Sequence, residues 1–528
     1  MLVNAAAKII FFVDIAKLHY SDEKCLYLQP AKHLNKIIVE KFFKKYIFWM
    51  TLLLIQFSCG VKPTDTVSVD CEPMLWPDYN GVTIPKNIAP LNFSTARFDS
   101  LQGIEASIKT ADGKVYDFDG DNYIDIPIST WREIVQKSAG GKMEVTVSEI
   151  FSNKKFVYRP TNIYVADSEV DPYLCYRLIA PGYEIYSHIG LYCRDLTTFE
   201  QKTVVDNKLL NGNCINCHSF CKGDPDIAQF HVRGDIGGTV LKSGDNLTAC
   251  NAKTDQLKLN CVYPYWHPSG NYIAYSQNNT VQSFHCGSAN RVEVYDSESR
   301  VVVYDVRNNK LLTCPELNSA RTFTTEPSFS PDGKYLYYTT ADTVDMAMKT
   351  RETHYDICRI GFDEKTGSFV GNVDTLVNVS KDSLSTAFPR PSYDGKWLLF
   401  TKCDYGQFAI WHKEAELWLL NLATGETFPL ERANGPDADS YHSWSQNSEW
   451  IAFESRRDDG FYTRAYIAHI NPNGHADKAF LIPQKSPEDN IKLMYSYNVP
   501  EFATKEFKVD KGVLEGKLKS GERTQFGY

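Results

Sequence analysis

The sequence lacks several features that mark well-known enzyme classes. It has no Gly-x-Ser-x-Gly motif and no hydrolase domain after its repeats, which argues against a serine hydrolase. It has no Gly-rich nucleotide loop. It also lacks a basic surplus, because the whole chain carries a net charge of -9 and the lysine-rich first 58 residues make the remainder still more acidic. An acidic body excludes nucleic acid as the expected partner.

The sequence also has no apolar run long enough to span a membrane near its start. The apolar run 46–58 is shorter than the roughly 20 residues that a spanning helix needs. Three lysines between residues 41 and 45 precede it, so residues 41–58 are interpreted as a signal peptide. Cys59 comes next, which predicts a lipidated mature N-terminus; ordinary secretion with cleavage nearby is the alternative.

Export places the protein in the cell envelope, in the periplasm or at the outer membrane. Membrane attachment would then run through the lipid on Cys59. Residues 1–40 have no role in front of a signal peptide, and we interpret them as an upstream start codon that is not used.

The chain of 528 residues is long enough for two or three domains, and its 31 Tyr and 29 Phe favour strands. Residues 60–70 form a polar tether. In residues 71–159, short alternating runs lie between turn signals, and only residues 129–138 have a helical pattern. This predicts a small β-sandwich domain without chemistry of its own.

Residues 160–505 contain a repeat in which two strands flank a tight turn. Aromatic or small residues precede a Ser-Pro-Asp-Gly-like turn, and alternating apolar residues follow it. The four copies are 265–275, 328–338, 391–400 and 444–453, with Ser448 in place of the turn glycine in the last. A further strand follows each copy, which is typical of β-propeller blades.

The blade count is less direct. Residues 173–205 and 230–259 are weaker candidates for blades, and residues 496–502 could supply a closing strand. We expect an all-β protein with six blades, five or seven being the alternatives, and a polar tail over residues 506–528.

The most specific motif is Cys-x-x-Cys-His at Cys214, Cys217 and His218, within an expected insert at 211–231. Two thiols at this spacing can add to the vinyl groups of one haem, and the adjacent histidine can ligate the iron. His231 is the candidate for the opposite face of the iron, with His442 and Met494 as rivals, and an open sixth position is an alternative. Arg233 is a candidate partner for a haem propionate.

Three other interpretations of the motif remain. Zinc could bind Cys214, Cys217, His218 and Cys221, although no second pair of ligands is evident. The first two cysteines could form a redox disulfide, although no thioredoxin-like pattern surrounds them. They could also be structural thiols. Ten further cysteines permit disulfides outside the cytoplasm, but the sequence does not define their pairing.

The repeat and the haem motif together resemble a known family. The turn pattern resembles the TolB-like, WD-repeat-like β-propeller. With the Cys-x-x-Cys-His segment and Ser440–Trp444, the chain is similar to outer-membrane lipoproteins of Gram-negative bacteria that carry such a propeller with a cytochrome c-type motif. The resemblance implies one covalent haem c and electron transfer or redox sensing with a partner in the envelope.

Two other functions stay open. The propeller could be an interaction scaffold for a protein, peptide or glycan, with the haem or thiol site structural. A hydrolase or lyase could instead use polar groups at the channel mouth, for which the candidates are His442, Arg456, Arg457, Asp458 and Asp459.

Overall fold

The computed structural model describes residues 65–96, 100–181, 187–285, 287, 290–344 and 350–528. The expected signal peptide, Cys59 and residues 1–40 lie outside these ranges. Among the described residues, no helix combines the length and apolar character needed to cross a membrane.

The N-terminal domain is built on one seven-stranded mixed sheet. Its strands are β1 (Asp65–Val69), β3 (Thr83–Ile84), β5 (Gly103–Lys109), β6 (Val115–Gly120), β7 (Gly141–Phe151), β8 (Lys154–Tyr158) and β9 (Thr161–Val165). A two-stranded ribbon of β2 (Leu75–Trp76) and β4 (Ser94–Thr95) accompanies it. The predicted helix is present as α3 (Ile128–Ser138), which buries Trp131 and Ile134.

Two boundaries differ from the expectation. Residues 60–70 were expected to be a tether, but Asp65–Val69 forms β1, which pairs in parallel with β8. The expected domain end at residue 159 is too early, since β9 pairs with β3 and β7 of the same sheet. The alternating pattern predicted the strands, whereas the parallel pairing of β1 depends on a distant partner.

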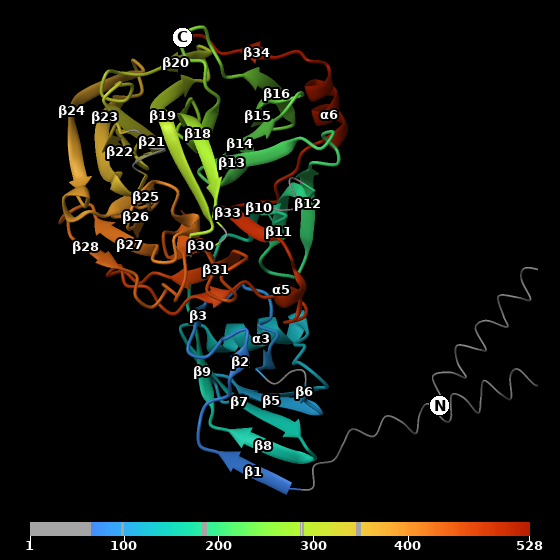
Figure 1. The fold of residues 1–528 in the computed structure, drawn as a ribbon. Helices are drawn as coiled ribbons and strands as arrows, with labels where there is room; N and C mark the ends of the chain where they lie inside the picture. Colours follow the sequence, from blue (N-terminus) through green and yellow to red (C-terminus); the bar gives the residue numbers. More distant parts are fainter. Residues whose placement is uncertain (1–64, 97–99, 182–186, 286, 288–289, 345–349) are drawn as a thin grey trace, which may run out of the picture. The chain divides into compact units, whose positions relative to one another are not determined.

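The rest of the described chain forms a six-bladed β-propeller (Figure 1). Blade 1 holds β10 (Tyr173–Ile179), β11 (Ile189–Asp195), β12 (Gln201–Asp206) and the closing strand β33 (Ser496–Ala503). Blade 2 holds β13 (Cys214–Cys221), β14 (Asp224–Arg233), β15 (Gly238–Ser243), β16 (Asn246–Asn251) and β34 (Thr524–Gln525). Blade 3 holds β17 (Cys261–Trp266), β18 (Tyr272–Phe284), β19 (Val292–Asp305) and β20 (Lys310–Leu312).

The last three blades follow in chain order. Blade 4 holds β21 (Thr322–Phe329), β22 (Tyr335–Asp342), β23 (Asp356–Asp363) and β24 (Ser368–Val377). Blade 5 holds β25 (Ser385–Pro391), β26 (Trp397–Cys403), β27 (Glu416–Asn421) and β28 (Thr427–Pro429). Blade 6 holds β29 (Asp439–Trp444), β30 (Trp450–Ser455), β31 (Arg464–His469) and β32 (Phe480–Leu481). Short helical segments are η3 (Thr350–Glu352), η4 (Ser380–Asp382), η5 (Ala409–Trp411) and α5 (Asp489–Lys492).

The predicted turn between the first two strands recurs with the same contacts. Ser330 Oγ donates to Asp332 (2.6 Å) and accepts the N–H of Tyr335 (2.9 Å). Ser392 makes the equivalent pair of bonds in blade 5. Gly333 has φ +74°, a left-handed conformation that favours glycine. The local sequence therefore determines the turn, which is why the repeats predicted the blades.

Every innermost strand carries the same β-bulge. One residue in each has φ between +39° and +55°, and the strand pairing shifts at that point. These residues are Cys217, Tyr263, Glu326, Phe388, Tyr441 and Val499. Because a bulge leaves backbone groups outside the ladder, side chains of the preceding blade satisfy some of them. For example, the Phe388 N–H donates to Glu326 Oε2 (2.7 Å).

The chain closes the ring with its C-terminal part, as predicted for residues 496–502. Strand β33 pairs with β10, so the last inner strand completes the first blade. Residues 506–528 were expected to be a polar tail, and this is wrong. Helix α6 (Lys511–Lys519) buries Leu514 and Leu518, and the ring of Phe526 stacks on Tyr304 with centroids 3.7 Å apart.

The N-terminal domain and blade 6 share one hydrophobic core. Trp131 and Ile134 of α3 belong to the same buried cluster as Trp450 and Phe480. The Tyr79 hydroxyl also donates to the Leu481 carbonyl (3.4 Å).

Candidate functional site: the cysteine–histidine strand and a cationic pocket

The Cys-x-x-Cys-His motif lies on β13, the innermost strand of blade 2. The expected insert at 211–231 is therefore wrong, since these residues form β13 and most of β14, two hydrogen-bonded strands of a blade. Cys217 is the left-handed residue of the bulge (φ +53°). The motif is thus part of the propeller framework.

His218 is a buried residue with the same place in its blade as His442. Each follows the left-handed bulge residue and precedes a serine and an aromatic residue. His442 Nε2 lies 2.7 Å from the Phe388 carbonyl and 3.2 Å from the Leu399 carbonyl, both in the preceding blade. Burial lowers the pKa of His218 to about 4, and the backbone of Cys175 opposes this shift weakly. Cys175 has the same position in blade 1 as Leu399 has in blade 5.

The two thiols of the motif do not share one open space with His218. Both Cys214 and Cys217 are half-buried. Burial raises the pKa of Tyr263 and Tyr441, and Cys217 adds a smaller contribution to both, so its thiol lies beside these two phenols. Cys214 instead packs against the hydrophobic core of blades 1 and 2.

The other residues predicted for the haem have partners within the fold. His231 is 4% exposed, and its Nδ1 lies 3.2 Å from Thr239 Oγ1. Burial lowers the pKa of His231 to about 3. Arg233 donates from Nε and Nη2 to the side-chain oxygen of Asn216 (3.1 and 3.2 Å) when that amide is oriented to accept.

These residues as folded do not fit a covalent haem. An iron ligated by His218 needs open space beside the imidazole, and this side chain is only 3% exposed. Neither of its ring nitrogens has a full hydrogen bond among the described residues, but the same ring position in blade 6 is used for contacts between blades. Covalent haem stays a prediction of the sequence.

The structure also bears on the zinc interpretation and on the rival axial ligands. In the described parts of the chain, no group of three or more His, Cys, Asp or Glu side chains is placed to share a metal ion. Cys221 is buried, and its Sγ lies 3.6 Å from the His267 carbonyl. Met494 is 58% exposed, beyond strand β32.

A comparison of the inner strands within the sequence shows that Cys217 and His218 belong to the blade repeat. Cys217-His218-Ser219-Phe220 corresponds to Tyr441-His442-Ser443-Trp444, and proline takes the histidine position in the other four blades. These prolines are Pro264, Pro327, Pro389 and Pro500. The blade repeat therefore begins before the Ser-Pro-Asp-Gly turn, and the second cysteine and the histidine of the motif belong to it.

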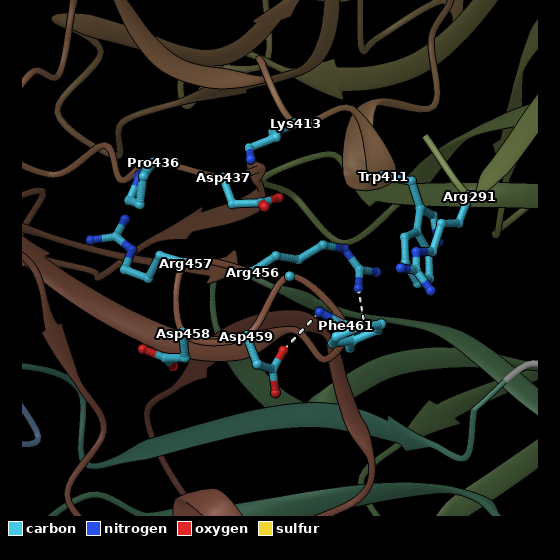
Figure 2. A pocket seen from close by; sticks show the side chains of 11 residues that line it. Arg291, Trp411, Lys413, Pro436, Asp437, Arg456, Arg457, Asp458, Asp459 and Phe461 are labelled. Carbon is cyan, nitrogen blue, oxygen red and sulfur yellow. Dashed lines mark hydrogen bonds between the residues drawn. The ribbon is translucent and has the colours of Figure 1, made fainter. Parts of the chain in front are cut away.

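A pocket of about 470 Å³ lies at the propeller end that carries the loops between second and third strands. Its lining comes from loops of three blades: Arg291 from the β18–β19 hairpin, Trp411 and Lys413 after β26, and residues 456–461 after β30. Figure 2 shows Arg291 and Trp411 on one side of this pocket and Pro436 and Arg457 on the other.

Two arginine–aromatic pairs define the pocket wall. The Arg456 guanidinium lies 3.3 Å from the ring centroid of Trp411, and that of Arg291 lies 4.5 Å from the ring centroid of Phe461. Arg456 is buried, and its Nε donates to the Ile410 carbonyl (2.8 Å). Arg291 and Lys413 are exposed, and so provide the cationic groups that a ligand could reach.

The acidic side chains of the pocket are largely occupied by their own loop. Asp459 Oδ1 accepts the N–H groups of Phe461 (2.7 Å) and Tyr462 (2.9 Å), and Asp458 accepts the hydroxyl of Tyr466 (2.7 Å). Arg457 pairs with the buried Asp439 (2.8 Å).

The structure brings together four of the five residues suggested for catalysis. Arg456, Arg457, Asp458 and Asp459 line the pocket, whereas His442 does not. His442 lies on an inner strand, and burial lowers its pKa to about 3. The pocket therefore lacks the imidazole that the catalytic interpretation required.

No family model and no curated protein matches the chain. Solved structures similar to it include TolB from Acinetobacter baumannii, 14% identical over 68% of this chain and 79% of that chain, with a TM-score of 0.41. Hydrazine synthase from Kuenenia stuttgartiensis is 11% identical over 65% of this chain and 48% of that chain, with a TM-score of 0.41. The β-propeller domain of the Trilobed protease from Pyrococcus furiosus is 8% identical over 62% and 78%, with a TM-score of 0.31.

These similarities concern fold alone. The propeller itself is established by the order and pairing of the strands.

Proposed function

We propose that this protein is an exported, lipid-anchored binding protein whose propeller holds an anionic ligand in the pocket beside Arg291 and Lys413. The observation that carries the proposal is the pocket wall, where two arginine–aromatic pairs and one exposed lysine come from three blades. Export and the anchor on Cys59 rest on the sequence of residues 41–59.

The chemistry of the pocket favours a carboxylate-bearing ligand, either an acidic segment of a protein or peptide or an acidic glycan. Guanidinium groups bind carboxylates through paired hydrogen bonds, and an aromatic face beside them limits where a ligand can lie. Because Asp459 accepts hydrogen bonds from its own loop and Asp458 accepts one from Tyr466 on β31, the exposed cations remain available. Binding should be sensitive to salt, since exposed charges are screened.

The experiment measures binding of poly-L-glutamate and polygalacturonate to the full-length protein at two ionic strengths. We expect one of them to bind, and Arg291→Ala with Lys413→Ala to weaken it by about tenfold or more, since tenfold corresponds to about 1.4 kcal/mol. The matched control changes two exposed lysines in the turns at the opposite end of the propeller, Lys334→Ala with Lys396→Ala. Equal losses in both double variants, or no binding by the wild type, would overturn the proposal.

Electron transfer or redox sensing through a covalent haem, with a partner protein in the envelope, stays a prediction of the sequence motif. The binding function does not depend on it, because the pocket and β13 belong to different parts of the propeller.

A further inference from the structure

A second set of polar side chains gathers inside the propeller, and none of them lines the pocket. It contains two buried carboxylates, Asp296 on β19 and Glu326 on the bulge of β21. Asp296 and Glu326 are each 0% exposed, and they come from neighbouring blades. Burying two carboxylates is costly, and the charge of opposite sign that acts on Glu326 is the Arg390 guanidinium.

Hydrogen bonds and one peptide link connect the two carboxylates. Asp296 Oδ2 accepts from Asn278 Nδ2 (2.6 Å) and Gln407 Nε2 (3.4 Å). Asn278 Nδ2 also donates to Thr325 Oγ1 (3.1 Å), and Thr325 immediately precedes Glu326 in the chain. On the other side, Glu326 Oε2 accepts the N–H of Phe388. Residues from three blades are thereby linked.

Five oxygen atoms of this set have no hydrogen-bond partner among the described residues. They are Asp296 Oδ1, Glu326 Oε1, Asn278 Oδ1, Gln407 Oε1 and the Tyr355 hydroxyl. Both amide nitrogens donate to Asp296, which leaves both amide oxygens free. Tyr355 is fully buried, and it lies near enough to Asp296 and Glu326 for both charges to raise its pKa beyond the effect of burial. Buried polar groups usually have a partner, so five unpartnered oxygens indicate a missing one.

We propose that Asp296, Glu326, Asn278, Gln407 and Tyr355 form a calcium site that joins blades 3, 4 and 5. The donor set contains oxygen alone, which suits a hard cation, and Ca²⁺ accepts carboxylates and amide carbonyls in irregular geometry. Two carboxylates balance its charge, and the neutral oxygens complete the shell together with water. The Tyr355 hydroxyl ligates the ion or holds one of these waters.

The test uses the full-length protein after treatment with a chelator and its removal. Calorimetric titration with CaCl₂ should give one site per chain, and saturating Ca²⁺ should raise the melting temperature by a few degrees. Asp296→Asn and Glu326→Gln should each reduce the calcium affinity at least tenfold. Glu454→Gln, which changes a buried carboxylate elsewhere, should leave it unchanged.

Tyr355→Phe keeps the test informative where a carboxylate variant does not fold. Removal of a hydroxyl that has no partner should leave the calcium-free protein at least as stable as the wild type, while calcium affinity falls. No stoichiometric binding by the wild type would overturn the site and would identify the set as protonated acids with buried water. Unchanged affinity in Tyr355→Phe together with Asp296→Asn would overturn it as well.

Discussion

Cys175 and Cys193 face each other across strands β10 and β11, with their Sγ atoms 3.3 Å apart. Both are buried, and the Phe507 N–H also donates to Cys193 Sγ (3.3 Å). We predict that these two cysteines form a disulfide in the exported protein, because an oxidising compartment removes the two thiol hydrogens from a pair already in contact. Digestion without reductant, followed by mass spectrometry, should recover the two peptides as one species.

The same experiment has an internal control. Cys403 is buried in a cluster that contains no other cysteine among the described residues, and should be alkylated only after unfolding, as a free thiol. The bond closes a short loop next to the closing strand β33, so its reduction should cost about 3 kcal/mol of stability. Alkylation of Cys175 in denaturant without reductant would contradict the prediction.

The equivalence of His218 and His442 leads to a second prediction. Because four other blades have proline at this position, His218→Pro should fold, with a loss of about 1 to 2 kcal/mol from the missing imidazole packing. The backbone can accept the change, since Cys217 and His218 lie in the bulge and outside the strand pairing. The measurement is urea unfolding of the variant and the wild type.

A matched proline substitution on the next strand provides the comparison. Val232 pairs with Ile215 on one side and Gly238 on the other. Val232→Pro should therefore cost about 3 kcal/mol or more, because a central strand loses a ladder hydrogen bond. Similar losses in the two variants would show that His218 has a role that the blade repeat does not explain.

The covalent haem has its own test. With β13 in its blade, we expect protein from a host with c-type maturation to show no α band in a pyridine haemochrome spectrum after acid–acetone extraction. The reason is that haem attachment requires His218 to leave its buried position beside the half-buried Cys214 and Cys217. A band that stays with the polypeptide would show that β13 is rearranged in the mature protein and would restore the redox function.

How far the sequence predicts this structure depends on the range of the interactions. The turns around Ser330 and Ser392 are stabilised within a few residues, so they could be recognised, and they led to the six blades. The motif at Cys217 and His218 could not be interpreted from its own residues, because the bulge that explains it is visible only when six inner strands are superposed.

Contacts between segments far apart in the sequence could likewise not be predicted from the sequence. The C-terminal segment has a polar composition, but four of its apolar residues, among them Leu514 and Phe526, are buried against blades 1, 2 and 3. The sequence predicts the pocket in part, through the polar loop 456–459, while Arg291 and Trp411 come from loops that only the ring of blades brings near it.

A last prediction concerns pH and Glu454, a buried residue of β30. Its carboxylate accepts the N–H of Val499 and the side chain of Asn498 (3.2 Å) on the closing strand. Burial raises the pKa of Glu454 from 4.5 to about 8. Between these two values the folded protein holds a proton that the unfolded chain has lost, so stability falls as the pH rises from about 4.5 and levels off above about 8.

Glu454→Gln stays neutral and keeps an oxygen that can accept from Val499, so it should lose this part of the pH dependence. From pH 5 to pH 9, the unfolding free energy of the wild type should fall by about 2 to 4 kcal/mol more than that of the variant. Asp296 and Glu501 shift in the same direction and remain in both proteins, so the difference between the two curves isolates Glu454. Glu426→Gln, at an exposed position, should follow the wild-type curve. Parallel curves for Glu454→Gln and wild type would mean that Glu454 is ionised in the folded propeller at neutral pH.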